Sequence, residues 1–147
     1  MNEDVALHEK LGIELFNYTW ELLDKSPRTH QEEDTMIHAA HASRFHWGKV
    51  GTAVNLARGE WQISRVYAVL GRAEAARFHA QRCLELCQEN GIGDFDLAFA
   101  YEVLARAAAV AGNTVERAKY LALAQEATLH IADKADLDVV VHDLETI

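Results

Sequence analysis

The chain has 147 residues, half of which are hydrophobic, and it contains only one proline and eight glycines. A chain of this length suits a single domain with its own core, and so few turn-forming residues argue against an all-β fold. The formal net charge of -9 repels polyanions and argues against nucleic acid as a partner. No apolar run could span a membrane, and the acidic amino-terminal residues do not resemble a secretory signal. We therefore expect a cytoplasmic all-α protein without a membrane association.

Apolar residues recur at helical spacing along the chain, and short breaks separate these runs, most of them containing glycine or proline. Ser26-Pro27, Asn90-Gly91 and Gly112-Asn113 are the clearest breaks. The spacing predicts helices over about residues 3–24, 30–48, 52–70, 73–89, 94–111, 115–132 and 135–146. The first six form three antiparallel hairpins, over about residues 3–48, 52–90 and 94–132, and the last helix caps the array within the same domain.

A repeat of 41 residues relates the three predicted hairpins. Shifting the sequence by this period matches Trp20 with Trp61, and it matches Gly71 with Gly112 at the turn between the two helices of a hairpin. Three further sets of equivalent positions are apolar or small throughout: Leu15, Leu56 and Leu97; Leu22, Ile63 and Leu104; and Ala42, Cys83 and Ala124. Because the period agrees with the independent glycine signal, it favours a stacked array of hairpins.

The second hairpin carries a pattern of a tyrosine, a Leu-Gly pair and a small residue. Tyr67 lies three residues before Leu70, and Ala76 lies five residues after Gly71. The small and apolar pattern continues along the next helix through Ala80, Cys83 and Leu86. This pattern resembles the middle of a tetratricopeptide repeat, in a variant longer than the usual period of about 34 residues. The resemblance covers about half of the chain well.

The resemblance implies a right-handed superhelix whose concave groove is lined by the first helix of each hairpin. Such a groove receives an extended peptide or a helix of a partner protein. A closed four-helix bundle with additional helices is the alternative architecture.

Carried onto this sequence, the resemblance marks six groove residues, which are Arg58, Trp61, Arg65, Phe99, Glu102 and Arg106. Tryptophan and arginine are frequent at the energetic centres of protein interfaces. Arg58 and Arg65 could therefore hold a carboxylate of the partner. The alternative is that Trp61 packs between hairpins while the arginines pair with nearby acids such as Glu60.

Several histidines gather in the second predicted helix. Asp34, His38 and His41 share one helix face and could together bind a divalent metal. This pattern supports an alternative function, a metal-binding helical bundle that could be an enzyme. Against it, His79 lies 41 residues after His38, which indicates a repeated structural position.

Other chemically reactive patterns are weak or missing in the sequence. Cys83 and Cys87 lie four residues apart on one helix face, and we expect them to be reduced and buried. There is no glycine-rich phosphate loop, no CxxC pair and no nucleophile elbow, so we predict neither a catalytic residue nor a cofactor. The sequence therefore favours a non-enzymatic interaction scaffold whose partner is a peptide, another protein or a second copy of the chain.

Overall fold

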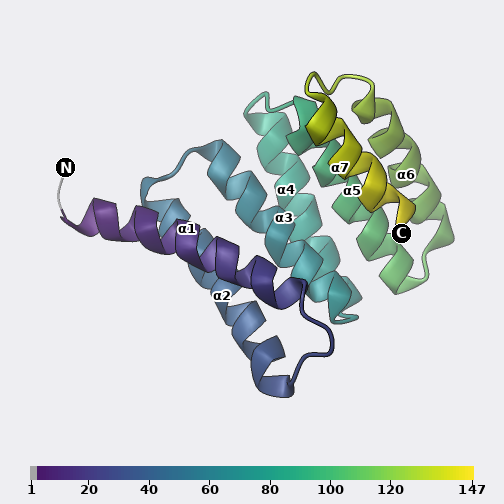
Figure 1. The fold of residues 1–147 in the computed structure, drawn as a ribbon. Coiled ribbons are helices and arrows are strands. Elements are labelled where there is room, and N and C mark those ends of the chain that lie inside the picture. Colours follow the sequence, from purple (N-terminus) through teal and green to yellow (C-terminus); the bar gives the residue numbers. More distant parts are fainter. Residues whose placement is uncertain (1–2) are drawn as a thin grey trace.

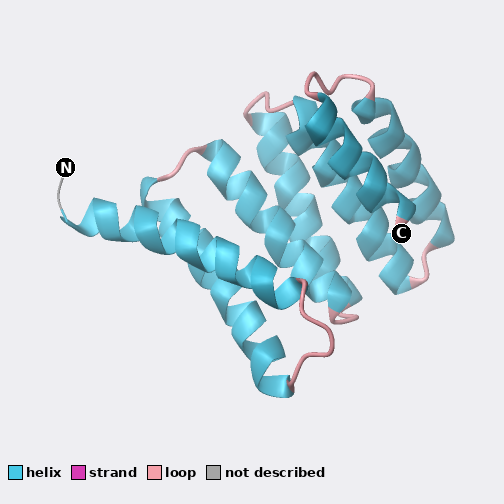
Figure 2. Cartoon of the chain, in the orientation of Figure 1, coloured by secondary structure: helices cyan, strands magenta, loops and turns pink. Residues whose placement is uncertain are grey.

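Over residues 3–147, the part of the chain that the computed structural model describes, the secondary structure consists of α-helices joined by short loops (Figure 1, Figure 2). The helices are α1 (Glu3–Leu23), α2 (His30–Val50), α3 (Ala53–Val69), α4 (Ala73–Glu89), α5 (Asp94–Ala111), α6 (Thr114–Thr128) and α7 (Lys134–Glu145). Consecutive helices pack in adjacent pairs, α1 with α2, α3 with α4 and α5 with α6. This confirms the predicted all-α fold. None of these helices is long and apolar enough to cross a bilayer.

α2 ends at Val50, between Gly48 and Gly51, where the sequence predicts the break, and the N–H of Gly51 donates to the carbonyl of Trp47 at 2.7 Å. One observed helix end differs from the predicted one. α6 ends at Thr128, earlier than the predicted residue 132. The next N–H groups, up to that of Ile131, donate to carbonyls only three residues back, which tightens the chain into a turn.

Capping side chains and glycines explain where most helices begin and end. At the start of α2, the side chain of Thr29 accepts from the N–H of Glu32, and the Glu32 carboxylate accepts from the N–H of Thr29. Asn113 caps α6 in a similar way, through the N–H three residues later. Gly71 and Gly112 adopt the left-handed conformation, with φ of 75° and 72°, so both predicted turns contain the residue that their backbone needs.

The 41-residue register relates the second and third hairpins helix by helix. α3 and α5 begin 41 residues apart, and so do α4 and α6. Equivalent positions have matching burial, since Leu22, Ile63 and Leu104 are all in the core. The first hairpin departs from the register because α1 and α2 are longer, with 21 residues each.

Small side chains let α4 pack closely against α3, as the resemblance to a tetratricopeptide repeat implies. Ala76 and Ala80 are completely buried. The hydroxyl of Ser64 on α3 donates to the carbonyl of Ala76 at 2.8 Å, which the absence of a larger side chain permits. The core then continues between α4 and α5 through Cys83, Cys87 and their neighbours.

Close packing also positions α1, one wall of the site described below. A Cβ atom at Gly12 would lie 2.9 Å from the indole ring of Trp47, so only glycine fits without displacing that ring. The hydroxyl of Ser43 donates to the carbonyl of Gly12 at 2.7 Å, and the amide of Gln62 donates to the carbonyl of Phe16 at 2.9 Å. These contacts attach α1 to both α2 and α3.

Replacing Gly12 with valine should lower the free energy of unfolding by about 2 kcal/mol, because the added methyl groups overpack the Trp47 ring. Urea denaturation followed by circular dichroism measures the change. Asn17→Val is the control, since Asn17 is exposed on the same helix, and it should cost less than about 1 kcal/mol. Equal losses for the two variants would contradict the steric explanation.

Candidate binding groove

A cavity of about 490 Å³ lies between α1 and α7, over the surface of α3 and α5. In Figure 1, α1 (purple) and α7 (yellow) both lie on the near side of the molecule, at either side of α3. A volume of this size is typical of pockets that bury a ligand or several side chains. We name this cavity the α1–α7 groove, and its lining residues are Phe16, Trp20, Asp24, Ala57, Arg58, Trp61, Cys83, Phe95, Asp96, Phe99, Val139 and Asp143.

Aromatic side chains from three helices form the apolar wall of the groove. The ring centroids of Trp20 and Trp61 are 5.3 Å apart, and those of Trp61 and Phe99 are 5.0 Å apart. Phe95 meets Phe99 edge to face, at 6.2 Å. These separations are typical of favourable aromatic pairs. The wall is therefore continuous from α1 through α3 to α5, and its members are only half-buried.

Arg58 is held against this wall by a carboxylate of the chain itself. Its Nε and Nη2 donate to the two carboxylate oxygens of Asp96, at 2.9 and 3.1 Å. Its guanidinium carbon lies 5.0 Å from the ring centroid of Phe95. The hydrogen bond to Asp96 raises the pKa of Arg58. The charge of Arg58 is therefore already paired within the groove.

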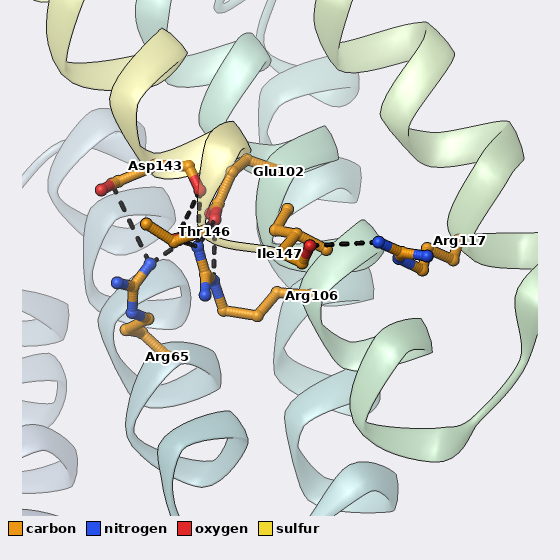
Figure 3. A network of polar contacts seen from close by, with 7 residues as sticks. All are labelled: Arg65, Glu102, Arg106, Arg117, Asp143, Thr146 and Ile147. Carbon is orange, nitrogen blue, oxygen red and sulfur yellow. Dashed lines mark hydrogen bonds and ion pairs between the residues drawn. The ribbon is translucent and has the colours of Figure 1, made fainter.

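Arg65, Glu102 and Arg106 lie outside the cavity lining and connect α3, α5 and α7 (Figure 3). The side chain of Glu102 is completely buried, and its Oε1 accepts from Arg106 Nε at 2.8 Å and from Arg65 Nη1 at 3.5 Å. Its Oε2 has no hydrogen-bond partner. Burial raises the pKa of Glu102, against the opposing effect of the two guanidinium groups.

The same two arginines hold the carboxyl-terminal end of α7. Arg106 Nη2 donates to the carbonyl of Asp143 at 2.9 Å and to the hydroxyl of Thr146 at 2.7 Å. Arg65 Nη1 lies 3.9 Å from the carboxylate of Asp143. Cations suit this end of a helix, where the carbonyl groups carry partial negative charge. The buried Glu102 is thus linked to the wall that α7 contributes (Figure 3).

Apolar packing completes the attachment of α7. Val140 is completely buried, in a cluster with Ala98 that also contacts Phe95 and Phe99 of α5. Leu137 and Leu144 pack against the same cluster. The helix predicted as a cap therefore also forms one side of the groove.

The structure separates the six predicted groove residues into two groups. Arg58, Trp61 and Phe99 line the cavity, whereas the other three stabilise the position of α7. Sequence reasoning missed Trp20, although its match with Trp61 in the 41-residue register was a usable signal. It also missed Val139, whose place in the wall follows only from the way in which α7 packs.

A second polar cluster joins α2, α3 and α4. His41 Nε2 lies 2.8 Å from the hydroxyl of Tyr67, and His79 Nδ1 lies 2.8 Å from Glu60 Oε1. Arg44 Nε donates to the other oxygen of Glu60 at 2.9 Å. Glu60 is thus paired on this side of α3, and not with the groove arginines. Burial, with a smaller contribution from the charge of His79, lowers the pKa of His41.

The suggested metal ligands are not brought together. Asp34 and His38 are exposed, while the ring of His41 turns to the Tyr67 hydroxyl. In the part of the chain that the structure describes, no group of three or more His, Cys, Asp or Glu residues is arranged to hold a metal ion.

The two cysteines are free and buried, as the sequence predicts. Cys83 contributes to the floor of the groove. A hydrogen bond with Cys87, together with burial, holds the pKa of Cys83 well above its ordinary value. Its thiol therefore stays protonated at neutral pH and is a poor nucleophile.

Comparisons with protein-family models, with curated proteins and with solved structures find no match. The class of protein is therefore defined by the fold and the site alone. It is an all-α protein of paired helices, with packing compatible with a helical repeat and an aromatic groove between its first and last helices.

Replacing Glu102 with alanine should lower the free energy of unfolding by about 3 kcal/mol, because two partly buried guanidinium groups lose their shared carboxylate. Thermal and urea denaturation measure the loss. Glu85→Ala removes a much more exposed carboxylate, paired with Arg82, and should cost less than about 1 kcal/mol. Similar values for both variants would show that the buried pair contributes no more than a surface pair.

The lowered pKa of His41 predicts that stability falls as the pH drops below about 6.5. The pKa of His41 is lower in the folded state than in the unfolded state. The contribution of His41 to the free energy of unfolding is therefore complete above the unfolded-state pKa, and it is lost as the pH falls towards the folded-state pKa. Urea midpoints between about pH 7.5 and 5.5 should therefore depend less on pH in His41→Gln. His30→Gln is the control, since the His30 side chain is 99% exposed. An unchanged slope in His41→Gln would refute the assignment.

Proposed function

We propose that this chain is a tetratricopeptide-like, non-enzymatic scaffold that binds an apolar segment of a partner protein in the α1–α7 groove. One observation carries the proposal, an aromatic-lined cavity of about 490 Å³ that remains open beside Val139, a residue 52% exposed. A concave, partly exposed apolar surface is typical of interaction sites. Aromatic side chains such as Trp61 supply much of the binding energy at protein interfaces.

The packing of α7 supports this choice of occupant. α7 is an amphipathic helix, and its buried Val140 packs on a surface that includes Phe95 and Phe99. Both rings also line the groove next to it. A partner segment of similar apolar character would continue the same packed surface between α7 and α1.

The resemblance to a tetratricopeptide repeat also supports the proposal, because it concerns the fold and not only the cavity. Gly71 adopts the left-handed turn that the pattern implies, and Ala76 is completely buried between helices, also as the pattern implies. The family lines its groove with the first helix of each hairpin. Here Trp20, Trp61 and Phe99 come from α1, α3 and α5, which are the first helices of the three hairpins.

Selection from a phage-displayed library of short random peptides, against the immobilised chain, tests the proposal. Selected peptides are labelled with fluorescein, and their dissociation constants are measured by anisotropy. Trp61→Ala should weaken binding by about thirtyfold, as expected for an interface hot spot. Phe78→Ala is the control, because Phe78 is an aromatic residue outside the groove lining and 62% exposed.

Trp61 also packs against the core, so a second pair of variants separates binding from stability. Val139→Trp fills the groove from an exposed position and should abolish binding. Val141→Trp, on the same helix at a residue 40% exposed and outside the groove lining, should bind as the unmodified protein does. Peptides that bind Val139→Trp equally well would contradict the proposal. A dimer that Val139→Trp dissociates would also overturn it, because a second copy would then fill the groove.

A further inference from the structure

The charged groups that line the α1–α7 groove do not balance. The lining holds three carboxylates, from Asp24, Asp96 and Asp143, but only the guanidinium of Arg58. Arg58 is already bound to both oxygens of Asp96. Asp24 forms no salt bridge within residues 3–147, and Asp143 reaches Arg65 only at 3.9 Å. Asp24 and Asp143 both interact with the charge of Arg65, but neither forms a close ion pair like that of Asp96.

The positive groups closest to the groove reduce this excess but do not remove it: with Glu102 included, four carboxylates face the three guanidinium groups of Arg58, Arg65 and Arg106. Arg65 and Arg106 share the buried carboxylate of Glu102. Arg106 also binds the carbonyl end of α7 through Asp143 and Thr146, where the helix dipole is negative. The whole chain carries a net charge of -9. The groove therefore combines apolar aromatic walls with negative charge.

Arg58 shows how this surface binds a cation. Its guanidinium lies 5.0 Å from the ring centroid of Phe95 while Asp96 holds its donors. Attraction between a cation and an aromatic ring is strengthened when a carboxylate stands beside it and water is excluded. The rings of Trp61 and Phe99 share the groove lining with the carboxylates of Asp24 and Asp143. Among the described residues, no cationic side chain lies over either ring.

From this arrangement we infer that the groove binds a lysine or arginine side chain of the partner segment, with its apolar stem against Trp61 and Phe99 and its charge towards Asp24 and Asp143. The inference rests on the proposed function and names the chemistry of its ligand. It reverses the sequence-based expectation that Arg58 and Arg65 hold a partner carboxylate, because both arginines already have carboxylate partners in the chain. Long cationic side chains suit such a site, since their methylene groups pack on apolar surface.

The first experiment compares synthetic peptides in which Leu, Ala, Phe and Ser are randomised around one fixed position. That position holds Lys, Arg, norleucine or Glu, and binding to the full chain is followed by the change in tryptophan fluorescence, to which Trp20 and Trp61 of the groove contribute. Lys and Arg peptides should bind about tenfold more tightly than norleucine peptides. Glu peptides should bind more weakly than norleucine peptides, and added salt should reduce the differences.

Charge changes at Val139 supply the matching test on the protein. Val139 lines the groove and is 52% exposed, so its replacement leaves the core intact. For Lys peptides, affinity should fall in the order Val139→Glu, Val139→Gln, Val139→Lys, and the order should reverse for Glu peptides. Val141→Lys, on the same helix outside the groove lining, should leave every affinity unchanged.

The outcomes distinguish the inference from the proposed function. If norleucine peptides bind as tightly as Lys and Arg peptides, and Val139→Trp blocks them all, the groove binds an apolar segment and the inference is wrong. The same conclusion follows if Val139→Lys and Val139→Glu have equal affinities for Lys peptides. If no peptide series binds, the proposed function fails and the inference fails with it.

Discussion

The buried carboxylate of Glu102 links the helices that set the shape of the α1–α7 groove. It lies between guanidinium groups from α3 and α5, and those same groups reach the end of α7. A buried charge is tolerated only when partners compensate for its lost hydration, so Glu102 and its two arginines form one interdependent unit. α7 is attached through this unit and through the packing of Val140, so the unit is one of the two contacts that hold the wall carrying Val139.

The opposite wall has a different physical origin. α1 is set by steric fit, with the Trp47 ring against the bare backbone of Gly12, and by side chains that donate to its carbonyl groups. Between the two walls, Trp20, Trp61 and Phe99 span three helices. Each wall of the groove is therefore held by its own polar contacts and its own packing, and single substitutions can alter each side separately.

Pairing within the chain also decides what the groove offers to a ligand. Arginines are common at carboxylate-binding sites, yet Arg58 and Arg65 are paired with acids from α5. Asp24 and Asp143 add negative charge along the aromatic wall, which the charge of Arg65 compensates in part. The histidines of α2 belong to a separate cluster with Tyr67, Glu60 and Arg44, in which His41 forms its contacts inside the protein.

The sequence by itself determined the features that depend on neighbouring residues. Helical periodicity and the glycines Gly71 and Gly112 predicted the helices and their turns, since these follow from local backbone preferences. The 41-residue register also identified Trp61 as the equivalent of Trp20, and the two rings are in contact in the structure.

Only the tertiary structure decided which charges are paired and where α7 lies. Arg58 and Asp96 are 38 residues apart and lie on different helices, so their contact depends on how α3 and α5 are rotated against each other. The place of Val139 in the groove depends in the same way on the docking of α7. The pairing of side chains across helices is set by packing geometry, which no local sequence pattern encodes. The sequence alone therefore could not predict the sign of the charge in the groove.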